Sequence, residues 1–165
     1  MSNESFYIRF ASEDDIPVIL EFITALAAYE RMSDQVVATE ERLRRTLFGE
    51  QQYAEVILGF EDSQPVGFAL FFHNYSTFLA QPGIYLEDLF VYPEKRGSGY
   101  GKALLTYLAR LAVERNCGRL EWSVLNWNKP AIGFYEKLSA KAQDEWTVYR
   151  LTGDSLARVA NGGEG

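Results

Sequence analysis

A glycine-rich turn between two apolar segments constrains this chain more than any other feature. The stretch EDLFVYPEKRGSGYGKALL, residues 87–105, overlaps a strand-like segment, Ile84–Val91. It then opens a run in which Leu104, Leu108 and Leu111 recur at helical spacing. A strand followed by such a turn and a helix start predicts an anion site, because the first N–H groups of a helix lack partners and the helix dipole adds positive charge there.

The spacing of the glycines excludes two common anion-binding motifs. A nucleotide-binding P-loop requires Ser or Thr after its Gly-Lys pair, whereas Ala103 stands there. The dinucleotide fingerprint G-x-G-x-x-G, started at Gly97, has Lys102 in place of its third glycine. The pattern that fits is R-x-x-G-x-G over residues 96–101.

Apolar periodicity and capping residues predict the other elements. The alternation of β-rich and helical segments, in the order β-α-α-β-β-β-α-β-α-β, indicates an α/β (α+β) domain with a mixed sheet and helices on its faces. The predicted strands are Phe6–Phe10, a hairpin of YAEVILGF and PVGFALFF around residues 61–64, Ile84–Val91 after a loop at residues 74–83, Leu120–Leu125 and Trp146–Leu151. The predicted helices run from Ser12 to about Arg31, from Thr39 to a residue before Gly49, from the glycine turn to about Asn116, and from Asn128 onward.

Length and composition fit a single domain. The 165 residues are 47% hydrophobic, and we expect one domain over residues 1–160 and a disordered tail at residues 161–165. The net charge of −7 argues against a broad nucleic-acid-binding face. No signal peptide or membrane-spanning run is evident, and the single cysteine, Cys117, fits a reducing compartment. We therefore expect a cytoplasmic protein. With His73 as the only histidine, we expect no metal site.

The R-x-x-G-x-G turn, followed downstream by NKPAIGFYEKL, resembles the acetyl-CoA-binding motif of the GNAT superfamily of N-acetyltransferases. The segments AAYERM, IYLEDLFV and WNKPAIGFYEKL are most similar to those of diamine acetyltransferases, of the spermidine/spermine and thialysine type. The resemblance implies a mostly antiparallel sheet that splays where acetyl-CoA binds, with the pantetheine lying between the strands Ile84–Val91 and Leu120–Leu125.

The resemblance also assigns residues to acetyl-CoA. The turn would surround the diphosphate, and the main chain of the preceding strand would bind the pantetheine. Asn128 has two interpretations that are compatible, as a helix cap and as a contact to CoA. The implied acetyl-CoA-binding residues are Leu89, Phe90, Val91, Arg96, Gly97, Ser98, Gly99, Tyr100, Gly101, Lys102, Asn128, Ala131 and Tyr135.

Amide formation from a thioester requires deprotonation of the amine and protonation of the departing thiolate. By resemblance, Tyr135 is the acid and Glu87 is the base, acting through water. Spacing alone favours core packing for Tyr135 on its helix. Asp88 is the alternative base. Because neighbouring strand residues face opposite sides, we expect at most one of Glu87 and Asp88 to point into a given cleft.

The resemblance places six residues at the amine site, and some of them have a simpler structural interpretation. Tyr29 and Glu30 could be an exposed helix end, and Trp122 could be core. A shorter preceding loop makes the alignment of Asp144 uncertain. The implied amine-binding residues are Tyr29, Glu30, Glu87, Glu121, Trp122 and Asp144.

The sequence leaves two hypotheses of different classes. The first is an N-acetyltransferase that acts on a polyamine, a diamine or a lysine-like amino acid, without a metal. The second is a non-catalytic module that binds an acyl-CoA, although such a module would need neither Glu87 nor Tyr135. The resemblance further implies a homodimer, with no nucleic acid or membrane as partner.

Overall fold

The computed structural model describes residues 5–163, and a five-stranded sheet in the order β1-β2-β3-β4-β5 is its central element. The first four strands pair antiparallel, and β5 pairs parallel with β4. This confirms the expected mixed, mostly antiparallel sheet. The strands are β1 (Phe6–Phe10), β2 (Glu55–Glu61), β3 (Gln64–Ser76), β4 (Gln81–Val91) and β5 (Leu120–Trp122).

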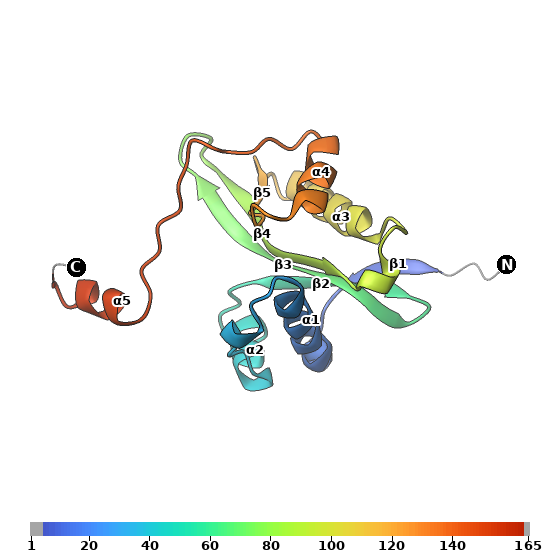
Figure 1. Cartoon of the computed structure of the whole chain (residues 1–165), viewed down its shortest axis with the longest axis horizontal. Coiled ribbons are helices and arrows are strands. Elements are labelled where there is room, and N and C mark those ends of the chain that lie inside the picture. The colour runs from blue at the N-terminus through green and yellow to red at the C-terminus, as the bar shows by residue number, and fades with distance from the viewer. Residues whose placement is uncertain (1–4, 164–165) are drawn as a thin grey trace. The chain divides into compact units, whose positions relative to one another are not determined.

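Helices cover both faces of the sheet. Figure 1 shows α1 (Ile16–Tyr29) and α2 (Glu40–Leu47) on one face and α3 (Tyr100–Glu114) on the other. The core on the α1 face combines aliphatic side chains with aromatic rings, and Phe22 stacks on Phe68 with centroids 5.1 Å apart. On the α3 face, the leucine stripe expected from the sequence faces the core, with Leu104 and Leu108 fully inaccessible and Leu111 half-buried.

The helix starts follow the capping signals of the sequence. The Thr39 hydroxyl accepts a hydrogen bond from the Arg42 amide at 3.2 Å, which fixes the start of α2. Ser12 and Asp15 form a capping box around the short 3₁₀ turn η1 (Glu13–Asp15) that leads into α1. Two further 3₁₀ turns are η2 (Ser33–Gln35) and η3 (Pro93–Lys95).

The second hairpin is longer than the sequence indicates. The sequence predicts a loop over residues 74–83, but β3 and β4 stay paired to Ser76 and Gln81. The reason is that polar residues at the end of a hairpin face solvent while their backbones still pair.

The first hairpin turns at Asp62 and Ser63, whose φ angles of 47° and 73° are left-handed, as a two-residue hairpin turn requires.

A β-bulge interrupts β4 in the middle. Leu70 of β3 pairs with Asp88, but the next residue, Phe71, pairs with Leu86, so Glu87 is the extra residue. Before the bulge, Leu86 lies on the α3 face; after it, Asp88 lies on the α1 face with Leu70. The bulge therefore reverses the facing of the strand at the position where the sequence places its two acidic residues.

The pairing of β4 with β5 is short. It covers Ile84–Leu86 of β4 and stops at Trp122, so the predicted strand Leu120–Leu125 is three residues too long. Within the described part of the chain, residues 87–91 of β4 have no strand partner on that edge. An edge of unpaired N–H and C=O groups can accept another extended chain.

The chain divides into two compact units, Met1–Ser123 and Val124–Gly165. The second unit contains α4 (Lys129–Lys137) and α5 (Gly153–Ala160), of which only α4 was predicted. The prediction of a final strand at Trp146–Leu151 is wrong: no strand is present there, because the segment has no strand partner among the described residues. Trp146 is 79% exposed and Tyr149 is 92% exposed.

Two further expectations concern the C-terminal tail and membrane-spanning helices. The expected tail includes residues 164 and 165, which lie outside the described residues. No helix within residues 5–163 has the length and apolar character needed to cross a bilayer.

Candidate active site

The glycine turn joins η3 to α3. Gly97 and Gly99 have φ angles of 86° and 84°, in the left-handed region that favours glycine. Among the described residues, no atom outside the turn lies within 4 Å of the position where a side chain would begin at either glycine. The first helical bond of α3 runs from the Ala103 amide to the Gly99 carbonyl at 3.0 Å. The amides before it point out of the helix start, so the turn fits a diphosphate laid against the backbone.

Arg96 does more than add charge to this turn. Its Nε donates a hydrogen bond to the Val91 carbonyl at 3.0 Å. Its guanidinium carbon lies 4.5 Å from the ring centroid of Tyr29 and 5.4 Å from that of Phe90. Arg96 therefore links the glycine turn to the end of β4 and to the end of α1, through cation–π contacts that the sequence does not reveal.

Three carboxylates gather on the α1 side of β4. Glu30 caps the C-terminus of α1, and Glu87 and Asp88 come from the bulge. Glu87 is near enough to raise the pKa of both Glu30 and Asp88. The bulge breaks the strict alternation on which the expectation for Glu87 and Asp88 depended, and which of the two serves the amine stays a prediction.

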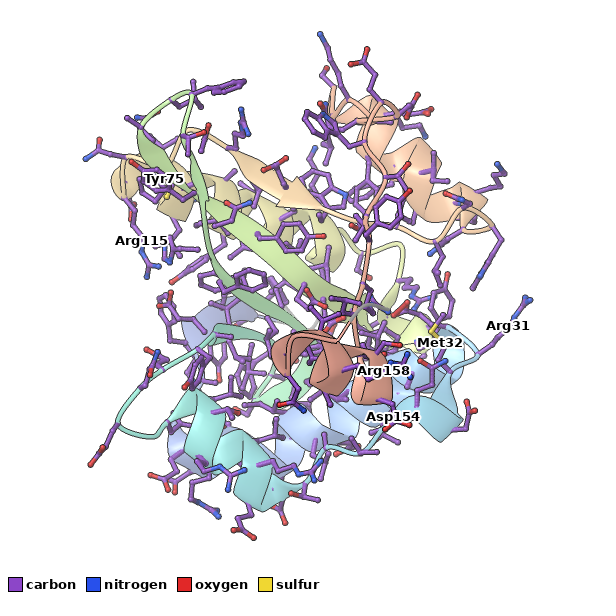
Figure 2. The ribbon with its side chains drawn as sticks, turned by 90° about the vertical axis from the view of Figure 1, so that its left-hand side faces the viewer. Arg31, Met32, Tyr75, Arg115, Asp154 and Arg158 are labelled. Atoms are coloured by element: carbon purple, nitrogen blue, oxygen red, sulfur yellow. The ribbon has the colours of Figure 1, made fainter. Side chains whose placement is uncertain are left out.

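The chain turns away directly after this cluster. Arg31 has a φ angle of 61°, and its side chain projects away from the ribbon (Figure 2). None of the three carboxylates forms a salt bridge with another residue of the described chain. Their negative charge is thus available to a cationic ligand.

Asp88 has the most perturbed pKa of the three. Burial raises the pKa of Asp88 to about 7, and the negative charges of Glu87 and Glu30 act in the same direction. Burial, and then Glu87, also raises the pKa of Glu30. A carboxyl group with a pKa near neutrality is tuned for proton transfer, and perturbed groups of this kind are characteristic of active sites.

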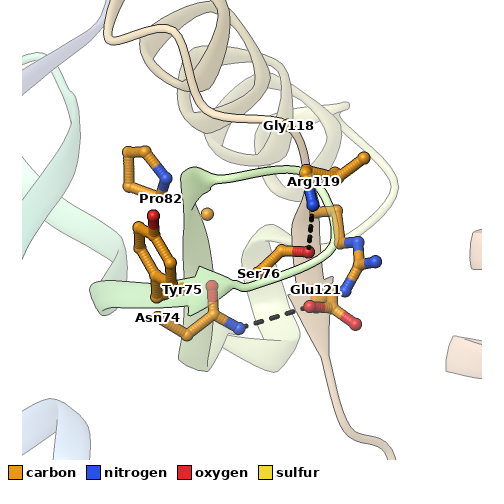
Figure 3. A pocket seen from close by; sticks show the side chains of 9 residues that line it. Asn74, Tyr75, Ser76, Pro82, Gly118, Arg119 and Glu121 are labelled. Atoms are coloured by element: carbon orange, nitrogen blue, oxygen red, sulfur yellow. Dashed lines mark hydrogen bonds between the residues drawn. The ribbon is translucent and has the colours of Figure 1, made fainter.

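Glu121 and Trp122 lie further along the sheet, on β5. The Asn74 amide donates a hydrogen bond to Glu121 at 3.2 Å, beside a small cavity of about 10 Å³ (Figure 3). That volume is about the space of one water molecule, so the cavity itself is too small for an amine substrate. Trp122 pairs with Leu86 in the parallel ladder.

The remaining predicted residues belong to the second unit. The side chain of Asn128 accepts a hydrogen bond from the Ala131 amide at 3.4 Å, which confirms Asn128 as the cap of α4. Tyr135 is partly buried on α4, with its ring centroid 5.5 Å from that of Phe134. Asp144 lies on an exposed turn. Their roles in binding and catalysis stay predictions.

The residues set aside in the sequence have structural partners. His73 Nε2 lies 3.3 Å from Arg115, which also forms a two-bond ion pair with Glu55. Cys117 is a half-buried thiol. Residues 5–163 contain no group of three or more His, Cys, Asp or Glu side chains arranged to hold a metal ion.

Sequence reasoning missed Glu61, which is buried beneath the glycine turn and contacts both Lys95 and Tyr100. The sequence placed Glu61 in an exposed hairpin turn. A usable signal was present, since the run YAEVILGF leads directly into Glu61 and a strand can continue into a buried acidic residue when a lysine or tyrosine can reach it.

The chain matches known proteins over most of its length. Residues 21–140 match the acetyltransferase (GNAT) family. The thialysine N-epsilon-acetyltransferase of Bos taurus is 37% identical, over 93% of this chain and 96% of that protein. The L-ornithine N5-acetyltransferase NATA1 of Arabidopsis thaliana is 34% identical, over 92% and 86% respectively.

A solved structure agrees with these relatives. The integron cassette protein VCH_CASS6, from the mobile metagenome of V. cholerae, superposes with a TM-score of 0.80 and 28% identity, over 94% of this chain and 98% of that one. The fold and the matches together define the class of protein. This chain belongs to the acetyltransferase (GNAT) family, and it is an acetyl-CoA-dependent N-acetyltransferase.

Proposed function

We propose that this enzyme transfers the acetyl group of acetyl-CoA to a primary amine of a small cationic substrate, which is a polyamine, a diamine or a lysine-like amino acid. The observation that carries the proposal is the gathering of Glu30, Glu87 and Asp88 without a cationic partner in the described chain. Unpaired carboxylates attract cations, and a substrate with two separated amines can place one ammonium group among them. The names of the relatives, for thialysine and for ornithine, agree with such a substrate.

We assign acetyl-CoA to the glycine turn and the edge of β4. The open space over Gly97 and Gly99 supports diphosphate binding by the turn, with Arg96 and Lys102 nearby in sequence. The unpaired edge of residues 87–91 supports main-chain bonds from Leu89–Val91 to an extended ligand. Ser98, Tyr100, Gly101, Asn128 and Ala131 complete the assignment by resemblance. Acetyl-CoA supplies the activated acyl group as a thioester.

We assign the proton transfers to Glu87 and Tyr135. Glu87 takes a proton from the substrate ammonium through water, so that the free amine can attack the thioester carbon directly. As the new C–N bond forms and the C–S bond breaks, the Tyr135 hydroxyl donates a proton to the departing sulfur. Asp88 sets the pH of this step: once it ionises near pH 7, it adds a negative charge beside Glu87 and holds the ammonium group in place.

The other predicted residues are proposed to orient the amine. Tyr29 lies beneath the guanidinium of Arg96 at the end of α1, next to Glu30. Glu121, Trp122 and Asp144 are assigned to the acceptor side by resemblance alone. The hydrogen bond between Asn74 and Glu121 holds the Glu121 carboxylate on the sheet.

We also propose that the enzyme is a cytoplasmic homodimer. The exposure of Trp146, Val148, Tyr149 and Leu151, from 51% to 92%, supports an interface, since an apolar segment of this length is rarely left in water. The lone Cys117 is compatible with a reducing compartment.

The test is the release of free CoA from acetyl-CoA with a panel of amines. The panel holds spermidine, putrescine, thialysine, lysine, ornithine, an aminoglycoside and a lysine peptide, and a neutral monoamine of similar length serves as the control. We expect turnover on at least one diamine or diamino acid and a much lower kcat/KM on the monoamine. Equal kcat/KM on the neutral monoamine would contradict the role of the carboxylates.

A further inference from the structure

Glu61 is a buried carboxylate at the last position of β2. Only 7% of the residue is exposed, and β2 lies two strands away from β4, which leads into the glycine turn. A buried carboxylate is costly unless charged or polar partners surround it. The partners of Glu61 therefore indicate what it does.

Those partners stand at the two ends of the glycine turn. Lys95, the last residue of η3, places its Nζ 2.5 Å from Glu61 Oε1. Tyr100, the first residue of α3, donates its hydroxyl proton to Glu61 Oε2. The ring of Tyr100 also stacks on Phe6 of β1 with centroids 4.2 Å apart. One side chain thus binds the residue before the turn and the residue after it.

Apart from Arg96, which binds the Val91 carbonyl and packs on Tyr29, the turn itself contains little that would hold it in place. Gly97 and Gly99 have no side chains, and the space around them is open. Glycine has more conformational freedom than any other residue, so the free chain would sample many arrangements of residues 96–99. The ends of the turn must be fixed for its amides to converge on one anion.

We propose that Glu61 is a positioning residue for acetyl-CoA binding: by holding Lys95 and Tyr100 together from the end of β2, it fixes the width of the glycine turn. The inference rests on the proposed assignment of the diphosphate to this turn. Glu61 also neutralises the charge of Lys95 beside the turn. Loss of the positioning effect would raise the KM for acetyl-CoA, whereas loss of the neutralising effect would lower it, so the direction of the change in KM tells the two effects apart.

The test compares Glu61→Gln with Glu55→Gln. Both substitutions remove an ion pair between β2 and a neighbouring element, and Glu55 binds Arg115 just after the far end of α3, at 2.7 Å. We expect Glu61→Gln to raise the KM for acetyl-CoA by about tenfold, with kcat and the KM for the amine within about twofold of wild type. Glu55→Gln should leave all three constants nearly unchanged, although we expect it to lower the melting temperature about as much as Glu61→Gln does.

Two results would overturn the inference. If both variants raise the KM for acetyl-CoA equally, Glu61 is merely structural. If Glu61→Gln lowers that KM, the main effect of Glu61 is to neutralise Lys95, and the freed lysine binds phosphate. Lys95→Met removes the other partner of Glu61, and Lys95 is not among the residues assigned to acetyl-CoA, so this variant should reproduce the rise in KM if Glu61→Gln folds poorly.

Direct titration of wild type with CoA separates this inference from the proposed function. If wild type binds CoA and acetylates an amine, the comparison of variants tests Glu61 alone. If Gly99→Val binds CoA as wild type does, the turn is not the diphosphate site, and the proposed assignment fails together with the inference.

Discussion

Replacing Asp88 by asparagine should make the protein more stable, and increasingly so as the pH rises. The pKa of Asp88 is raised from 3.8 to about 7, first by burial and then by Glu87 and Glu30. In the folded state the carboxyl group therefore keeps its proton between about pH 4 and 7, where the unfolded chain has lost it. The folded state binds more protons in this window, so the free energy of unfolding of wild type falls as the pH rises through it.

The size of the effect follows from the same numbers. The difference between 3.8 and about 7 corresponds to at most about 4 kcal/mol, reached above pH 7. Asp88 is only partly buried, so we expect roughly half of this, or about 2 kcal/mol. The substituted amide side chain would have nearly the same shape as the carboxyl group and no charge to bury. The stability gained by Asp88→Asn should then be close to zero at pH 4 and about 2 kcal/mol at pH 8.

The assay is urea denaturation of wild type and Asp88→Asn at pH 4, 6 and 8. Taking the difference between the two proteins cancels the titration of most other groups. In a Glu30→Gln background the gain at pH 8 should shrink, because Glu30 is one cause of the raised pKa. If Asp88→Asn gains the same stability over wild type at pH 4 and at pH 8, the carboxyl group of Asp88 is not buried among negative charges, and the reasoning is refuted. If the ionisation of Asp88 helps to hold the ammonium group, kcat/KM of wild type should rise as the pH passes about 7, and Asp88→Asn should lack this rise.

Three further predictions concern catalysis, CoA binding and assembly. Tyr135→Phe should lower kcat by about ten- to a hundredfold and leave the affinity for CoA intact; a kcat within twofold of wild type would remove Tyr135 as the acid. Gly99→Val should abolish CoA binding in calorimetry, since a side chain at φ 84° is strained and occupies the space over the turn. An affinity within threefold of wild type would speak against the turn as the diphosphate site. Sedimentation should show a dimer at micromolar concentration, and a monomer there would contradict the proposed interface.

The glycine turn and the helix after it could be predicted because their signals are local. Left-handed glycines, a helix start and a leucine stripe are each encoded within a few residues. The caps at Thr39 and Asn128 are local in the same sense. These features give the turn and the helix start of the candidate CoA site, whose role in binding stays a prediction.

The carboxylate cluster could be predicted only in part. Glu30 and Glu87 were assigned to the amine site, but the contribution of Asp88 depends on the bulge. A bulge is a property of two paired strands, and the segment IYLEDLFV alone does not show which residue is the extra one. Glu61 was missed for a related reason, because its partners lie 34 and 39 residues away along the chain.

The failed strand at Trp146–Leu151 illustrates the limit of periodicity. Its alternating apolar residues resemble a strand, but a strand exists only where another backbone completes its hydrogen bonds. The described chain offers it none. The helix α5 was missed because its eight residues include Gly153 and few large apolar side chains.

The bulge in β4 also means that residues before it and residues after it pack in different layers, so substitutions on its two sides have different neighbours. The even-numbered positions of β4 are apolar or acidic, but so are most of its odd-numbered positions, so the sequence does not show where the strand changes face. The core behind those positions changes at Glu87, because Leu86 belongs to the α3 layer and Phe90 to the α1 layer. Substitutions at Leu86 would therefore covary with residues of one layer and those at Phe90 with residues of the other. Evolution could retune the layer beneath the amine site while leaving unchanged the layer that carries the first helix after the glycine turn.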